Sequence, residues 1–185
     1  MKCKFLLSIV SFIGLSLFVL SATAADTVEK FHYQLTADHG LDLSELLHGS
    51  LQVAAFSDRR EDLSGKHINN TMQLPVDAAE LVRNAVVQGF AQGNAPIVNA
   101  DAPQIFSGEV TEFNAKQLES GDTQVSITAK LQLQSASGKR YWQGSIIGKA
   151  TVAASEGINQ ALQQALDKFV GNLFYEEYLL IQLID

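Results

Sequence analysis

Hydrophobic and polar residues alternate most strictly in the stretch Thr123–Gln134 (TQVSITAKLQLQ). Every odd position from Val125 to Leu133 is hydrophobic, whereas the even positions carry Ser, Thr, Lys or Gln. A period of two predicts a β-strand with one dry and one wet face, as in an antiparallel sheet covered on one side. After the turn SASGKR, Tyr141–Val152 alternates in the same way, so we predict a long hairpin.

Three further stretches predict strands. Phe31–Leu35 (FHYQL) alternates hydrophobic with polar residues, and Gln104–Phe113 has a similar character. Leu51–Phe56 (LQVAAF) is hydrophobic nearly throughout, which is typical of a strand buried on both faces.

Two stretches instead repeat with a helical period. Hydrophobic residues recur three and four positions apart in Val76–Phe90 and in Ser155–Phe174, which predicts two amphipathic helices. The expected fold class is α+β: a curved, mainly antiparallel sheet in the order β-β-α-β-β-β-α with both helices on its dry face. Gly144 and Gly148 fall on the dry face of the last strand and would let a helix lie close to the sheet.

The start of the chain has the pattern of a secretory signal. Lys2 and Lys4 precede the hydrophobic run Phe5–Leu20, and Ala22-Thr23-Ala24 is a suitable cleavage site. We expect residues 1–24 to be removed, with cleavage near Ala24 or Ala25, and residues 25–185 to form one α+β domain that is periplasmic or secreted. The alternative is an uncut membrane anchor, but a run of about 16 residues is shorter than the roughly 20 that span a bilayer.

Cys3 is the one cysteine, and it precedes the hydrophobic run. It would leave with the signal, so the mature chain would have no disulfide, thiol nucleophile or thiolate metal site. Removing residues 1–24 removes two lysines and no acid. The balance is then 11 basic against 20 acidic residues, a net charge of −9. This charge argues against nucleic acid as a partner, and no further membrane-spanning segment is expected.

Catalytic motifs do not stand out. The four histidines (His32, His39, His48 and His67) lack the spacing of metal ligands, and there is no G-x-S-x-G or G-x-G-x-x-G pattern. We therefore expect solvated histidines, no cofactor, no metal and no enzymatic activity.

The charged run SDRRED offers one candidate binding site. Arg59 and Arg60 could clamp a carboxylate or phosphate. The alternative, which we favour, is a solvated turn in which one of these arginines pairs with Asp58, Glu61 or Asp62.

Several of these patterns together resemble the YajG family of small exported proteins, usually lipoproteins, of Gram-negative bacteria. The resemblance rests on VAAFSDRR, the helix from Val76 to Phe90, Gly108–Val110, the alternating VSITAKLQLQ, SASGKRYW and the helix opening SEGINQAL. It covers about residues 51–173 and implies no catalytic residues. The difference is that such relatives usually carry a lipidated cysteine at the mature N-terminus.

Two functional hypotheses follow. The first is a non-catalytic envelope protein that acts as a protein-interaction or transport-accessory module, most simply through an exposed sheet edge. The alternative is a binder of a lipid or other hydrophobic small molecule between sheet and helices, where Gly144 and Gly148 leave room. The hydrophobic tail Tyr178–Ile184 is predicted to pack on the protein's own core, and a docking segment is the other possibility.

Overall fold

The computed structural model describes residues 26–28, 31–44, 47 and 49–184, and the predicted signal segment lies outside them. Its main sheet runs in the order β2-β5-β6-β7, with the short strand β3 also paired to β5. Strands β5, β6 and β7 are antiparallel neighbours, whereas β2 and β3 run parallel to β5. The strands are β2 (Leu51–Val53), β3 (Ser57–Asp58), β5 (Gln104–Gln117), β6 (Thr123–Ser135) and β7 (Arg140–Val152).

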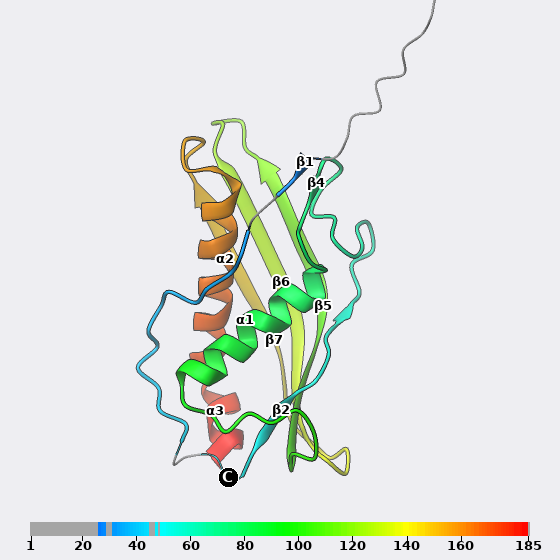
Figure 1. The fold of residues 1–185 in the computed structure, drawn as a ribbon, viewed down its shortest axis with the longest axis vertical. Coiled ribbons are helices and arrows are strands. Elements are labelled where there is room, and N and C mark those ends of the chain that lie inside the picture. The colour runs from blue at the N-terminus through cyan, green and yellow to red at the C-terminus, as the bar shows by residue number, and fades with distance from the viewer. Residues whose placement is uncertain (1–25, 29–30, 45–46, 48, 185) are drawn as a thin grey trace, which may run out of the picture.

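Three helices and a small second sheet complete the described structure. Helices α1 and α2 lie on the same face of the main sheet (Figure 1). The short strands β1 and β4 pair in parallel with each other. The bounds are β1 (Asp26–Thr27), β4 (Met72–Gln73), α1 (Ala78–Gln92), α2 (Gly157–Phe174) and α3 (Glu177–Ile184). The predicted α+β class with a mainly antiparallel sheet is confirmed, with a third helix where two were expected.

The predicted hairpin is β6 and β7. Cα partners run from Thr123 opposite Val152 to Gln134 opposite Arg140. The odd residues of β6 from Val125 to Leu133 are all buried. Because hydrophobic residues occupy alternate positions on both strands, one face of the hairpin enters a continuous core with α1 and α2.

Gly148 explains how α2 can lie so close to β7. A Cβ built on Gly148 would fall 2.2 Å from the Ala165 carbonyl oxygen and 2.5 Å from the Cβ of Phe169. Only glycine permits this approach of helix backbone to strand, so the predicted close contact is confirmed.

The predicted strand Phe31–Leu35 is wrong, although its alternation is informative. Phe31 and Tyr33 are buried and His32 and Gln34 are exposed, but the segment is not part of a sheet. Side chains from the helices bind it instead. Gln88 Nε2 donates to the Tyr33 carbonyl at 3.1 Å, and the Tyr33 hydroxyl donates to Asp167 at 3.0 Å. Burial, together with the Asp167 carboxylate, raises the pKa of Tyr33.

The stretch Leu51–Phe56 is also less regular than predicted. Strand β2 ends at Val53, Gln52 and Ala54 are half-buried, and Ala55 is exposed. This edge has one covered face rather than two, because α1 and α2 lie on the same face of the sheet.

Candidate functional site

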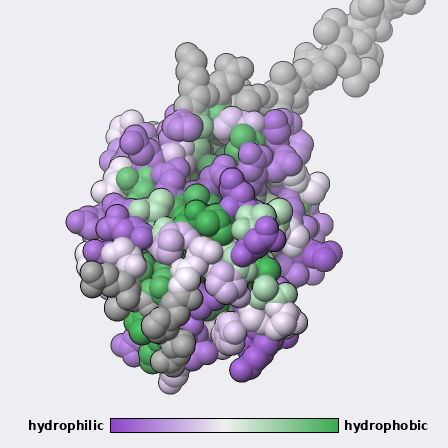
Figure 2. All heavy atoms as spheres, turned by 60° about the horizontal axis from the view of Figure 1, so that its bottom comes forward, coloured by the Kyte–Doolittle hydropathy of each residue, from purple (hydrophilic) through white to green (hydrophobic). Residues whose placement is uncertain are grey.

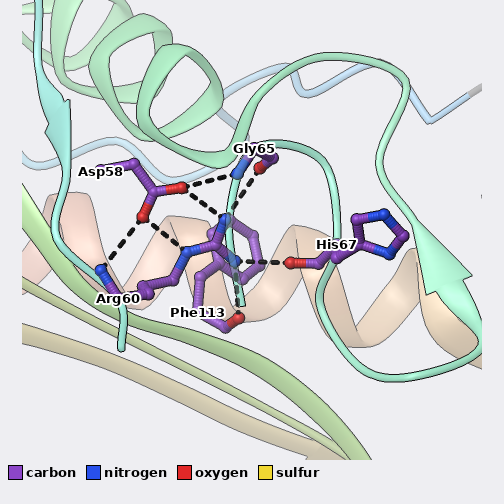
Figure 3. A network of polar contacts seen from close by, with 5 residues as sticks. All are labelled: Asp58, Arg60, Gly65, His67 and Phe113. Carbon is purple, nitrogen blue, oxygen red and sulfur yellow. Dashed lines mark hydrogen bonds and ion pairs between the residues drawn. The ribbon is translucent and has the colours of Figure 1, made fainter. Parts of the chain in front are cut away.

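Arg60 lies in the charged run that the sequence singled out, and its side chain is only 3% exposed. Its Nε and Nη2 donate to the two carboxylate oxygens of Asp58 at 2.8 and 2.7 Å. Nη2 also donates to the Gly65 carbonyl at 2.8 Å, and Nη1 donates to the carbonyls of His67 and Phe113 at 2.6 and 3.1 Å (Figure 3). A guanidinium has five N–H donors, so every donor of Arg60 has a partner within the protein.

Asp58 completes this network from the end of β3. Its Oδ2 accepts a hydrogen bond from the Gly65 backbone N–H at 2.8 Å, and its Oδ1 accepts one from the Arg60 N–H at 3.2 Å. The hydrogen bond from the Arg60 side chain is the largest of the effects that hold the pKa of Asp58 below its ordinary value, and partial burial opposes it. The pair fixes the loop between β3 and Ile68 against β5.

The pairing that we favoured for the arginines is thus confirmed for Arg60 and Asp58. Arg59, Glu61 and Asp62 are exposed, as expected of a solvated turn, but the Arg60 side chain is buried. With all five donors engaged, Arg60 has no N–H left to clamp a ligand. Arg59 has a side chain that is 66% exposed, and its Nε lies 4.0 Å from Glu109. Binding of a ligand by these arginines stays a prediction, and Arg59 is the one whose guanidinium is accessible.

Arg60 also covers one edge of the sheet. Beyond the end of β3, the Phe113 carbonyl of β5 accepts from Arg60. Ala115 is the next residue of β5 whose backbone groups face away from β6. Its N–H donates to the Ile68 carbonyl at 2.9 Å, and its carbonyl accepts from Asn69 Nδ2 at 3.1 Å. Side chains and loop backbone therefore replace the missing neighbour strand.

Strand β2 is covered in the same manner. The Leu51 N–H donates to the Pro96 carbonyl, and the Leu51 carbonyl accepts from the Val98 N–H, both at 3.0 Å. Arg83 Nη2 of α1 donates to the Val53 carbonyl at 2.8 Å. The outward backbone groups of this edge have partners at these positions.

The opposite edge of the sheet is β7, which pairs with β6 alone among the strands of the described residues. The Ile147 carbonyl accepts from Asn172 Nδ2 of α2 at 2.7 Å, so this carbonyl faces away from β6. Backbone groups alternate between the two sides of a strand, so those of Ser145 and Lys149 face outward too. Strand β7 has 13 residues and thus presents a long edge suitable for pairing.

The sequence predicted contact through an exposed sheet edge but did not identify the strand. The alternation of Tyr141–Val152 shows which face is dry, not which neighbour is missing. Strand order depends on contacts distant in sequence. The one local signal is Ile147, a hydrophobic residue at a wet position that is 53% exposed.

The space expected beneath β7 for a lipid is filled. Gly148 lies against the backbone of α2, and a Cβ on Gly144 would fall 2.4 Å from the ring of Trp142. The small residues are therefore used for close packing. This observation removes the basis on which lipid binding between sheet and helices was predicted.

The helix-free face of the sheet carries an open polar depression of about 310 Å³. Its lining includes Ser107, Lys130, Gln132 and Gln143. Gln132 Nε2 donates to the Ser107 hydroxyl at 3.0 Å, so part of this polar surface is already paired.

The histidines are dispersed. His32 and His67 are exposed, as expected, and His48 lies outside the described residues. His39 is half-buried, contrary to the prediction of solvated histidines, because its ring packs against Phe174 at a centroid distance of 5.8 Å. In the described part of the chain, no three His, Cys, Asp or Glu residues gather in a way that could hold a metal ion.

The hydrophobic tail forms α3. Leu179 and Leu183 are fully buried, whereas Tyr178, Ile181 and Ile184 are 74%, 50% and 37% exposed. Hydrophobic surface is visible at this end of the molecule, surrounded by hydrophilic residues (Figure 2). The prediction that the tail packs on the core holds for one side of the helix.

None of the helices within residues 26–28, 31–44, 47 and 49–184 is long and hydrophobic enough to cross a membrane.

A known structure shares this fold. Protein XCC0632 from Xanthomonas campestris, described under the family model DUF330, superposes with a TM-score of 0.60 over 82% of this chain and 94% of its own, at 12% identity. Weaker likenesses include a PelC dodecamer from Paraburkholderia phytofirmans (TM-score 0.43, 20% identity, 67% of this chain and 86% of that one). Lipoprotein GNA1162 from Neisseria meningitidis has a TM-score of 0.34 at 18% identity, over 71% of this chain and 96% of that one.

At 12% identity, the likeness to XCC0632 concerns the fold alone. No protein-family model matches the sequence, and no curated protein is similar to it. The resemblance to the YajG family stays a prediction.

Proposed function

We propose that this chain is a non-catalytic protein of the bacterial cell envelope that binds another protein by strand addition to the free edge of β7. The supporting observation is the difference between the two edges of the sheet. One is covered by Arg60, Arg83, Asn69 and the segment 96–98, while β7 leaves outward backbone groups available for pairing.

Strand addition suits β7 for three physical reasons. Main-chain hydrogen bonds to an edge strand give affinity that is independent of side chains. The 13 residues of β7 are held rigidly by β6 on one side and by α2 below, so little ordering is needed on binding. Ile147 supplies a hydrophobic contact in the middle of the edge.

Site-specific photo-crosslinking tests this role in cells. A photoreactive phenylalanine analogue replaces Ile147 on β7 and, in a matched control, Lys66, which is exposed in the loop near the covered edge. We expect a discrete protein adduct from position 147 and none from position 66. Equal adducts from both positions, or no adduct from 147, would contradict the proposal.

A second variant separates strand addition from simple proximity. Ser145→Pro removes an N–H that faces away from β6, and edge strands tolerate proline at such positions. The adduct from position 147 should disappear while the melting temperature stays within a few degrees of the parent. An adduct that persists would show that the partner binds elsewhere.

The envelope location rests on the sequence of residues 1–25. Intact-mass measurement of the exported protein should give a chain that begins at Ala25 or Asp26. A retained Met1 or an acylated cysteine would contradict this part of the proposal.

A further inference from the structure

The hairpin that ends in β7 differs in charge from the rest of the protein. Residues 123–152 contain Lys130, Lys139, Arg140 and Lys149 and no acidic residue. The whole chain has a net charge of −7, so the remaining residues sum to −11. A charge of +4 is thus concentrated on one hairpin of an acidic protein.

These cations lie beside the position that an added strand would occupy. All four are exposed. Arg140 and Lys149 belong to β7 itself, near its two ends, and Lys139 directly precedes the strand. Lys149 stands opposite the uncharged Ser126, and Arg140 stands opposite the uncharged Gln134.

Lys130 is different from the other three. It belongs to β6, and its Cα partner on β5 is Glu109, so part of its charge faces an acid of the same chain. The charge available at the β7 edge is therefore chiefly that of Lys139, Arg140 and Lys149.

We propose that the segment that pairs with β7 is an acidic extended peptide of another protein. Its carboxylates would face Lys149 at one end and Arg140 at the other, with an uncharged residue opposite Ile147. This inference rests on the proposed function and specifies the chemistry of its partner. A charged strand edge selects its partner because like charges opposite each other destabilise a strand pair, whereas unlike charges stabilise it.

The same charges disfavour a second copy of this chain as the occupant. Antiparallel pairing of two β7 strands about Ile147 would bring two hairpins of charge +4 together. It would also place each Lys149 opposite a Ser145, leaving the cations without acidic partners.

Synthetic peptides test the proposal on the purified protein. The probes are three fluorescein-labelled twelve-residue peptides of Thr that carry Glu, Gln or Lys only near their two ends, so that these residues can face Lys149 and Arg140 while Thr lies opposite Ile147. We expect the Glu peptide to bind at least ten-fold more tightly than the Gln peptide in 50 mM salt, as measured by fluorescence anisotropy. Its binding should shift the amide NMR signals of β7 and should weaken as salt is raised.

Charge reversal supplies the matched variants. Lys149→Glu should weaken binding of the Glu peptide by about five-fold or more, the size expected for loss and reversal of a partly exposed charge pair. Lys116→Glu changes an exposed cation on β5, two strands away, and should leave the affinity unchanged. Equal effects of the two substitutions would overturn the proposal, because only the net charge would then matter.

Each remaining outcome is decisive. If the Gln and Lys peptides shift the β7 signals as strongly as the Glu peptide, strand addition stands and the acidic partner is wrong. If no peptide shifts the β7 signals, the proposed function fails as well. Binding to phosphatidylglycerol vesicles that depends on Lys149, without peptide binding, would replace the acidic peptide by a membrane surface.

Discussion

The two edges of the sheet are stabilised in different ways. At β2, β3 and β5, polar side chains and short loop segments form hydrogen bonds with outward backbone groups, with Arg60 at the centre of the longest network. At β7, stability comes from hydrophobic packing beneath the strand, and its outer backbone is bonded at Ile147 by the single side chain of Asn172. Covering an edge prevents unwanted pairing, whereas an uncovered edge that is long and regular is available for a partner.

The difference between the two edges predicts that Arg60 contributes far more to the free energy of unfolding than Arg59. Arg60→Ala should lower the free energy of unfolding by about 3–5 kcal/mol, because it leaves Asp58 and three backbone carbonyls without their donor. Arg59→Ala, the matched control, should change it by less than about 0.5 kcal/mol, since that side chain is mostly exposed. Urea denaturation measures both. Similar effects of the two substitutions would show that the network does not stabilise this edge.

On the β7 side, packing should dominate. Leu183→Ala should destabilise the protein by about 2–5 kcal/mol, because Leu183 is fully buried and α3 contacts β7 and α2. Ile181→Ala on the outer side of α3 is the control and should cost less than about 1 kcal/mol. If Ile181→Ala were the more costly change, the exposed side of α3 would have to be covered in solution.

The stability that the edge formed by β2, β3 and β5 contributes should also depend on pH. The pKa of Asp58 is lowered in the folded protein, so its contribution to stability is present above its unfolded pKa of about 3.9 and is lost as the pH falls toward the folded value. Asp58→Asn should therefore destabilise the protein at neutral pH and flatten the pH dependence of stability below about pH 4. Urea midpoints between pH 2.5 and 7 measure this. An unchanged acid profile in the variant would assign the acid sensitivity to other carboxyl groups.

The smallest effect is expected at the free edge. Asn172→Ala removes the hydrogen bond to the Ile147 carbonyl, but this group is exposed and water can replace the donor. Stability should fall by less than about 1 kcal/mol in thermal unfolding. A loss of several kcal/mol would mean that Asn172 is a structural cap of β7, comparable to Arg60 at the other edge.

The sequence by itself determined the elements with a strict period. Thr123–Gln134, Tyr141–Val152 and the two long helices follow from local patterns, because a dry face must repeat every two residues in a strand and about every 3.6 in a helix. The same reasoning failed for Phe31–Leu35. Its alternation shows that one side of the segment is buried. The segment lies against the helices, and it does not pair with a strand.

Only the tertiary structure decided what the polar residues do. Arg59 and Arg60 are neighbours of the same type in the sequence, yet one is exposed and the other is buried with all its donors bonded. The partners of Arg60 include Phe113, which is 53 residues away, and no local pattern encodes that distance. Strand order is likewise set by contacts far apart in the chain. The net charge of the β6–β7 hairpin can therefore be counted from the sequence, but the position of β7 at a free edge of the sheet cannot be predicted from it.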